Sequence, residues 1–276
     1  MSDELFSGRV GFIGCGAMAR ALAGGLAAAG IAPERIAGAD PDKAQREAFT
    51  AISGGRSLTD NAALVAESDL VVLAVKPGLV SGVLSQLAGT KDLERPLWIS
   101  IAAGIRIGTI ASALPGGARI IRTMPNTPAL ARHGATALCG NSEASDADLA
   151  NAEALFQTVG ITWRAPEEAS LDAVTALSGS GAAYVFLFLE ALEDAGAELG
   201  LPRKVAEELA LQTVYGAATL LREQDERPAT LRAHVTSPGG TTQAAIERLE
   251  ADGFRELVAR ALKAARERSI ELSREP

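Results

Sequence analysis

The chain has 276 residues, of which 47% are hydrophobic and 22% are charged, and its formal net charge at pH 7 is −8. A chain of this length exceeds what one compact core usually holds, so we expect two domains. The acidic balance argues against a nucleic-acid or anionic-membrane partner, because both attract basic surfaces.

The two cysteines, Cys15 and Cys139, lack the number and spacing of a zinc site or a disulfide framework. We therefore expect no metal and a reducing, cytoplasmic location. The first ten residues, MSDELFSGRV, are acidic and short of apolar residues, unlike a secretory signal. The apolar run at 182–189 ends at Glu190 and is too short to cross a bilayer.

The first 165 residues alternate short apolar runs with helical patterns. The strand-like runs, which are bounded by Gly, Pro or Asp, lie at 10–13, 35–39, 70–75, 97–102 and 119–124. The helical patterns lie at 17–29, 42–51, 60–66, 79–87 and 107–114. Near-continuous apolar strands separated by helices predict an α/β fold with a parallel sheet covered on both faces. Later strands near 136–139 and 161–164 would extend this sheet.

After Pro166 the chain reads as helix without a strand. The predicted helices lie at 182–199, 203–223, 242–250 and 254–273. We place the domain boundary near Ala165, which gives an α/β domain at 1–165 and an all-α domain at 166–276. The helix from 182 is apolar on nearly all sides through Leu189, so it must be buried. Burial in a homodimer is favoured over burial within its own chain, because most soluble oligomers are symmetric homo-oligomers.

A glycine-rich motif follows the first strand and opens a helix in VGFIGCGAMARALAGGL. Gly14 permits a tight turn, Gly16 lets the backbone approach a pyrophosphate, and Ala19 allows close helix packing. Free N–H groups at the helix start favour phosphate. The pattern predicts a Rossmann-type dinucleotide-binding domain. Its expected cofactor contacts in this loop are Gly14, Cys15, Gly16, Ala17, Met18 and Ala19.

Asp40 closes the next strand at the distance where an acidic residue usually binds the adenosine ribose. Its carboxylate would accept both ribose hydroxyls of NADH and would repel the 2′-phosphate of NADPH. Lys43 and Arg46, just downstream, are cations that would bind this phosphate if Asp40 turned outward. The sequence therefore leaves the choice between the two coenzymes open.

Further cofactor contacts are expected where other strands end, because open α/β sheets bind ligands there. These candidates are Asn61, Val75, Lys76, Pro77, Met124 and Asn126. The turn MPNTP (124–128) holds two prolines and would form a rigid wall beneath the nicotinamide. Lys76 is alternatively a solvated loop lysine, and Asn61 is alternatively a residue that only starts a helix.

A loop interrupts the C-terminal helices at VTSPGGTT (235–242). Pro238 and the glycines prevent helix from running through. The N–H groups of residues 239–242 are then free at a helix start, a site for one small anion without a strong cation. By itself this pattern fits a plain capped helix start equally well.

Six motifs occur in order over residues 8–273: GFIGCGAMA, AVKPG, SIAAGI, IIRTMPNTPAL, ALSGSGAAYVF and VTSPGGTTQAAIERLE. On these motifs the chain resembles the pyrroline-5-carboxylate reductase family, apart from Ala182, where the family commonly has proline. The resemblance implies a Rossmann domain, a helical dimerisation domain, and a dimer or an assembly of dimers. It also implies NADPH- or NADH-dependent reduction of L-1-pyrroline-5-carboxylate to L-proline, the last step of proline synthesis.

The resemblance supplies a ligand for the loop at 235–242, a small cyclic imine with one carboxylate. The expected substrate contacts are Ser237, Gly239, Gly240, Thr241 and Thr242. Thr242 is the expected catalytic group, with its hydroxyl near the ring nitrogen. His133 and His234 are interpreted as structural.

Two other functions stay open at this stage. A β-hydroxyacid dehydrogenase shares the Rossmann domain and the helices, but its chemistry needs a lysine after a GxGxxxK turn. In this chain the sequence at 179–185 is GSGAAYV, so Val185 stands where that pattern has its lysine. A dinucleotide-binding redox sensor would bind NAD(P)H without oxidising it with the imine.

Overall fold

The computed structural model describes residues 8–273. They form two compact units. The first runs to Ser180 and resumes from Ala265, and the second is Gly181–Ala264. The first unit thus continues past Ala165, where the sequence places the domain boundary, and includes a segment close to the C-terminus.

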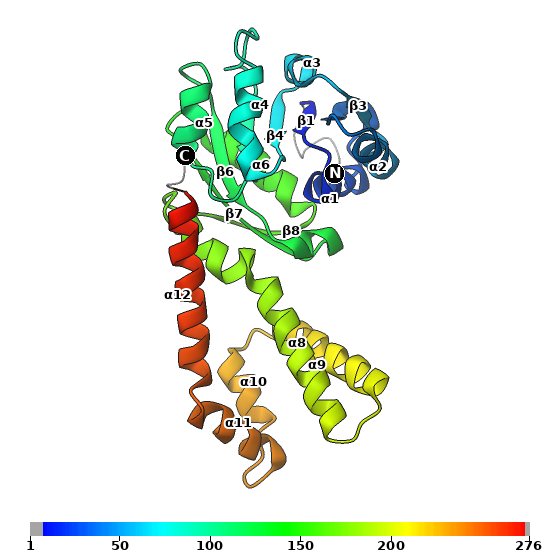
Figure 1. The fold of residues 1–276 in the computed structure, drawn as a ribbon, viewed down its shortest axis with the longest axis vertical. Helices are drawn as coiled ribbons and strands as arrows, with labels where there is room; N and C mark the ends of the chain where they lie inside the picture. Colours follow the sequence, from blue (N-terminus) through cyan, green and yellow to red (C-terminus); the bar gives the residue numbers. More distant parts are fainter. Residues whose placement is uncertain (1–7, 274–276) are drawn as a thin grey trace. The chain divides into compact units, whose positions relative to one another are not determined.

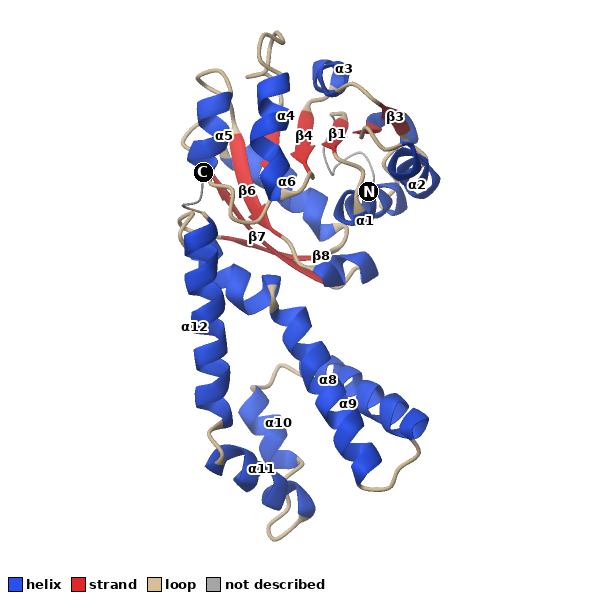
Figure 2. Cartoon of the chain, viewed as in Figure 1, coloured by secondary structure: helices blue, strands red, loops and turns tan. Residues whose placement is uncertain are grey.

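Among the described residues, eight strands of the first unit form one sheet in the order β3-β2-β1-β4-β5-β6-β7-β8, drawn red in Figure 2. They are β1 (Val10–Ile13), β2 (Ile36–Ala39), β3 (Arg56–Leu58), β4 (Leu70–Leu73), β5 (Leu97–Ser100), β6 (Ile120–Met124), β7 (Gly134–Gly140) and β8 (Gly160–Arg164). Each strand predicted from the sequence is present. Every neighbouring pair is parallel except β6 and β7. The predicted α/β class with a mainly parallel sheet is confirmed.

Two features of the sheet differ from the prediction. Strand β3 was not predicted, because Arg-Ser-Leu is short and largely exposed and carries no apolar run. Strand β7 is antiparallel to β6. The connection at 125–133 explains this, since a parallel crossover needs a dozen or more residues.

Helices cover both faces of the sheet (Figure 1). One face packs against α1, α2 and α6, through residues such as Leu22, Phe49 and Phe156. The other packs against α3, α4 and α5, through residues such as Leu64 and Leu84. The helices are α1 (Ala17–Ala28), α2 (Lys43–Ser53), α3 (Asn61–Glu67), α4 (Val80–Gln86), α5 (Ile107–Ala113), α6 (Asp146–Gln157) and α7 (Ser170–Val174). Shorter turns are η1 (Pro33–Arg35), η2 (Pro77–Leu79), η3 (Thr127–Ala131) and the π-helical η4 (Thr175–Gly179).

Helix α6 was not predicted, although its start carries a recognisable signal. Ser145 accepts a hydrogen bond from the Asp148 N–H, and the Asp148 carboxylate accepts one from the Ser145 N–H. This reciprocal capping box was hidden in the sequence because aspartate takes the place of the usual glutamate.

A polar network attaches the end of α12 (Phe254–Leu272) to the first unit. Ser269 donates to the buried carboxylate of Asp172 at 2.8 Å. Arg106 contacts the other Asp172 oxygen at 3.4 Å and donates to the Ser273 hydroxyl at 2.8 Å. These contacts explain why the residues after Ala265 belong with the sheet.

The second unit consists of helices, as predicted. They are α8 (Gly181–Glu198), α9 (Arg203–Glu223), α10 (Pro228–His234), α11 (Thr241–Ala251) and the first part of α12. Helices α8 and α9 pack closely where Gly196 faces Ala206, since a Cβ added to Gly196 would lie 3.1 Å from the Ala206 Cβ. Helix α10 was not predicted, because its seven residues show no clear apolar period.

The second unit leaves an unusual amount of apolar surface uncovered. No residue of α8 is buried, and Phe186 and Leu187 are 59% and 66% exposed. Burial of this helix within its own unit, the alternative to a dimer, is therefore not observed. By length and composition alone, the helical stretch Ser170–Glu198 would also pass as a membrane span. This differs from the prediction, which considered only the apolar run at 182–189.

Candidate functional site

The glycine-rich loop between β1 and α1 has the geometry of a phosphate-binding turn. Gly14 has φ +96°, and a Cβ there would lie 2.9 Å from the Ala74 carbonyl, so only glycine fits. Gly16 caps α1 without a side-chain hydrogen bond, and a Cβ there would meet no atom within 4 Å. The loop therefore leaves open space at uncapped helical N–H groups, which fits a pyrophosphate.

Asp40 lies beside this loop, at the end of β2. Its Oδ2 accepts from the Cys15 N–H and its Oδ1 from the Asp42 N–H, both at 2.9 Å. These two bonds fix the carboxylate next to the glycine-rich turn. Any ribose bound over the turn would meet an oriented acidic group.

Two guanidinium groups flank the same place. Arg46 donates to the Asp40 carbonyl at 2.6 Å and to the Pro41 carbonyl at 2.9 Å. Arg20, from the first turns of α1, donates to the Cys15 carbonyl at 2.9 Å. Sequence reasoning named Arg46 but missed Arg20. The signal available for Arg20 was its position one helical turn after Gly16, on the same side of α1.

Cys15 and Cys139 are both buried. Burial, with the nearby Asp40 carboxylate, raises the pKa of the Cys15 thiol to about 12. Burial also raises the pKa of Cys139. A nucleophilic cysteine needs a lowered pKa, so neither thiol suits that role.

Strand β4 ends beside the glycine-rich loop, and its following residues were predicted cofactor contacts. Val75 is partly buried, whereas Lys76 and Pro77 are exposed where η2 begins. Lys76 makes no ion pair with any residue of the range 8–273. Asn61 opens α3, but Asp60 caps that helix by accepting from the Ala62 N–H. The Asn61 side chain is therefore not needed as the cap.

The MPNTP turn is attached to the π-helical turn η4 through Asn126. Its side-chain N–H donates to the Ser178 carbonyl at 3.1 Å, and its side-chain oxygen accepts from the Ala135 N–H at 2.9 Å. Met124 packs against Gly179, where a Cβ would collide with its terminal methyl. The structure thus brings two of the sequence motifs together, which spacing alone did not predict.

The loop at 235–242 is partly different from expectation. The Gly239 N–H donates to the Gln243 side chain at 2.7 Å, and the Gly240 N–H donates to the Ser237 carbonyl at 3.0 Å. The sequence predicted that these two N–H groups would be free, and that prediction is wrong. Gly239 has φ +71°, which explains the glycine there.

Helix α11 begins at Thr241 directly after this loop. No described side chain caps it at Gly240, so its first N–H groups point out of the helix end. Thr242 is partly buried and Ser237 is exposed. An anion site at this helix start would rest on the N–H groups of Thr241 and Thr242.

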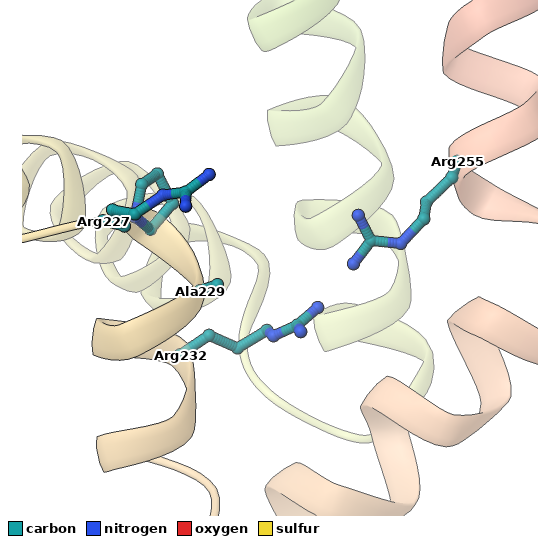
Figure 3. Close-up of a pocket in the computed structure, with 5 residues that line it drawn as sticks. Arg227, Ala229, Arg232 and Arg255 are labelled. Carbon is teal, nitrogen blue, oxygen red and sulfur yellow. The ribbon is translucent and has the colours of Figure 1, made fainter.

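A separate hollow of about 310 Å³ lies at the start of α10, the end of that helix away from residues 235–242 (Figure 3). It is lined by Arg227, Pro228, Ala229, Arg232 and Arg255. Glu250 already accepts from Arg255 at 2.7 Å and from Arg232 at 3.3 Å. The hydrogen bond from Arg255 lowers the pKa of Glu250. We interpret this cluster as structural.

Two family models match separate parts of the chain. The model for pyrroline-5-carboxylate reductase dimerisation matches residues 168–272. The model for NADP oxidoreductase, coenzyme F420-dependent, matches residues 9–104.

Curated relatives match over nearly their full length. A pyrroline-5-carboxylate reductase of Pseudomonas aeruginosa is 45% identical over 96% of this chain and 97% of its own. One from Synechocystis is 45% identical over 96% of this chain and 98% of its own. One from Arabidopsis thaliana is 41% identical over 96% of this chain and 95% of its own.

Solved structures agree with the curated relatives. A pyrroline-5-carboxylate reductase from Coxiella burnetii has a TM-score of 0.92 at 39% identity, covering 98% of this chain and 100% of its own. The Plasmodium falciparum pyrroline carboxylate reductase with NADP bound has a TM-score of 0.85 at 33% identity, covering 97% of this chain and 98% of its own.

Proposed function

Because the chain belongs to the pyrroline-5-carboxylate reductase family, we propose that it reduces L-1-pyrroline-5-carboxylate to L-proline with NADPH or NADH. The observation that carries this proposal is the 45% identity to a pyrroline-5-carboxylate reductase over 96% of the chain. The lysine of a β-hydroxyacid dehydrogenase is missing after Gly181, which argues against that alternative.

The open, uncapped turn at Gly16 supports a dinucleotide site on the first unit. In this proposal the pyrophosphate rests on the loop residues 14–19, and Asp40 faces the adenosine ribose. The remaining contacts come from the strand ends, at Asn61, Val75, Lys76, Pro77, Met124 and Asn126. Bound there, the reduced nicotinamide supplies a hydride.

The substrate carboxylate is assigned to the start of α11, with Ser237, Gly239 and Gly240 shaping the loop and Thr241 and Thr242 donating their N–H groups. A helix start holds an anion without a full positive charge nearby. This matters because a cation beside a protonated imine would oppose the protonation that makes its carbon reactive. The Thr242 hydroxyl is assigned to the ring nitrogen, where it orients the imine and passes it a proton.

The helical region 166–276 is assigned to dimerisation and substrate binding, and 1–165 to the dinucleotide. The uncovered apolar residues of α8 support a homodimer, and an assembly of dimers is compatible with them. We assign the protein to the cytoplasm, without a membrane or nucleic-acid partner.

The test mixes the purified protein with racemic pyrroline-5-carboxylate and either NADPH or NADH. The loss of absorbance of the reduced nicotinamide measures the oxidation. We expect imine-dependent oxidation that forms proline and consumes half of the racemate. Binding of the coenzyme without turnover would instead support the redox-sensor alternative.

A further inference from the structure

Cys15, in the middle of the glycine-rich loop, is held from three directions. Its side chain is fully buried against Gly38, where a Cβ would lie 2.7 Å from the Cys15 Sγ. The Cys15 N–H donates to the Asp40 carboxylate at 2.9 Å, and the Cys15 carbonyl accepts from the Arg20 guanidinium at 2.9 Å. The side chain, the N–H and the carbonyl of this residue are therefore all fixed by the protein.

The guanidinium group of Arg20 is itself held in place. Its Nη1 donates both to the Cys15 carbonyl and to the side-chain oxygen of Gln45, which lies in the first turn of α2. The backbone N–H of Arg20 donates to the Gly16 carbonyl at 3.0 Å, which forms the first turn of α1. Arg20 thus ties the glycine-rich loop to α2 as well as to its own helix.

This arrangement decides which way the next N–H group points. No peptide bond among residues 8–273 is cis, and in a trans peptide the carbonyl and the following N–H lie on opposite sides. The Cys15 carbonyl faces Arg20, so the Gly16 N–H points away from Arg20. Within the described range this N–H has no acceptor, and a Cβ on Gly16 would meet no atom within 4 Å. The Gly16 donor is therefore open to a ligand.

We propose that Arg20 is a positioning residue for the dinucleotide: by holding the Cys15 carbonyl, it aims the Gly16 N–H at the pyrophosphate. This inference rests on the dinucleotide site of the proposed function. Without the guanidinium, the peptide between Cys15 and Gly16 could turn its carbonyl toward the phosphates, because Gly16 has no side chain to restrain it. A carbonyl oxygen there would repel the anion that the N–H attracts. Arg20 acts alike on NADPH and NADH, since both carry the pyrophosphate.

Arg20→Gln tests the proposal through coenzyme binding, measured by calorimetry without the imine. We expect the Kd of NADPH and that of NADH to rise by the same factor, about tenfold, because both complexes lose an oriented hydrogen bond to a charged group. The KM for each coenzyme should rise in the same way while kcat at saturating coenzyme is unchanged. The matched control is Arg56→Gln, which makes the same change of charge on β3, where Arg56 pairs with Glu67 at 2.7 Å. This control should leave both Kd values unaltered.

A second variant separates positioning from direct contact with the coenzyme. Gln45→Leu removes the acceptor that holds the Arg20 guanidinium but keeps the Arg20 charge and a residue that favours helix. Positioning predicts that this release raises the Kd of both coenzymes, by less than Arg20→Gln does. Direct contact between Arg20 and a phosphate predicts an unchanged or lower Kd, because the guanidinium would be freed to reach the phosphate. That result would contradict the proposal, and it decides the question even if Arg20→Gln fails to fold.

Two results of Arg20→Gln would overturn the proposal. A Kd that rises for NADPH alone would assign Arg20 to the 2′-phosphate, which NADH lacks. Unaltered Kd values for both coenzymes would show that the Cys15 carbonyl needs no donor. Neither result depends on turnover of the imine. Wild-type protein that binds neither coenzyme would overturn the proposed function together with this inference, whereas wild-type binding with no effect of Arg20→Gln overturns this inference alone.

Discussion

Asn126 and Ser178 join two turns that lie 52 residues apart, through an amide-to-carbonyl hydrogen bond of 3.1 Å. The other end of the same amide accepts from the Ala135 N–H. Both ends of the Asn126 side chain are therefore in use within the protein. We infer that the Asn126 side chain holds the MPNTP turn against η4, which leaves the cofactor contact proposed for this residue to its backbone.

Asn126→Asp tests this role, because aspartate keeps the acceptor for the Ala135 N–H and loses the donor to Ser178. We expect the free energy of unfolding to fall by about 1–3 kcal/mol, the cost of leaving a partly buried carbonyl without its donor. Urea denaturation measures the change. Unaltered stability combined with a raised KM for NAD(P)H would instead assign the side chain to direct cofactor contact.

Cys15 should make the protein sensitive to alkaline pH. Burial raises the pKa of the Cys15 thiol from 9.0 to about 12 in the folded state, so the folded chain holds this proton more tightly than the unfolded chain. A raised pKa gives stability that is full below pH 9 and is lost as the pH rises toward 12, at up to about 1.4 kcal/mol per pH unit. Cys15→Ala should flatten this slope.

The measurement is urea unfolding of wild type and Cys15→Ala at several pH values between 8 and 11. Other groups titrate in this range, so the difference between the two proteins isolates Cys15. Parallel pH profiles would show that the Cys15 thiol titrates alike in both states.

Ser269 should stabilise the first unit through Asp172. Its hydroxyl donates to a carboxylate that is 2% exposed, and the remaining contact from Arg106 is longer, at 3.4 Å. We expect Ser269→Ala to lower the free energy of unfolding by about 1–3 kcal/mol, because the buried Asp172 carboxylate loses its best donor. Ser85→Ala is the control, since the Ser85 hydroxyl bonds only the exposed Ser81 carbonyl in its own helix. If Ser269→Ala and Ser85→Ala lowered the free energy of unfolding equally, the hydrogen bond from Ser269 to Asp172 would have no particular importance for stability.

The parts of the fold that were predictable from sequence are those with local signals. The turn at Gly14 and the strand ending at Asp40 each depend on a few adjacent residues, and the structure has both elements where the sequence indicated. Strand β3 and the direction of β7 depend instead on pairing with a neighbour, which no local pattern encodes.

The candidate site shows the same division. The open start of α11 followed from Pro238 and the glycines, whereas the bond from the Gly239 N–H to Gln243 depends on a rotamer that sequence does not specify. Arg20 was missed because its place beside Cys15 is a matter of three-dimensional packing. The link between Asn126 and Ser178 was missed for the same reason.

Thr242 should matter for the proposed reduction through its hydroxyl. Thr242→Ala should lower kcat/KM for the imine by about one to three orders of magnitude if that hydroxyl passes a proton to the ring nitrogen. Thr242→Ser keeps the hydroxyl and should recover much of the loss, which separates proton delivery from packing of the methyl group. Wild-type turnover by Thr242→Ala would remove this assignment.

Asp40 should decide how strongly the protein prefers one coenzyme. Its carboxylate is held beside the glycine-rich turn by the N–H groups of Cys15 and Asp42. A fixed negative charge there accepts the ribose hydroxyls of NADH and repels the 2′-phosphate of NADPH, while Arg46 lies close enough to offset part of that repulsion. We therefore expect both coenzymes to work in the wild-type protein.

Asp40→Ser removes the charge and keeps a small acceptor. The ratio of kcat/KM for NADPH to that for NADH should then rise by about tenfold or more, equivalent to ~1.4 kcal/mol. The ratio must be measured at one ionic strength, because salt screens the phosphate contact. Adding Arg46→Gln to Asp40→Ser should reverse most of the gain, since the phosphate would lose its nearest cation. A ratio that Asp40→Ser leaves unmoved would mean that Asp40 does not face the adenosine ribose, and a gain that survives Arg46→Gln would shift the phosphate contact to Arg20.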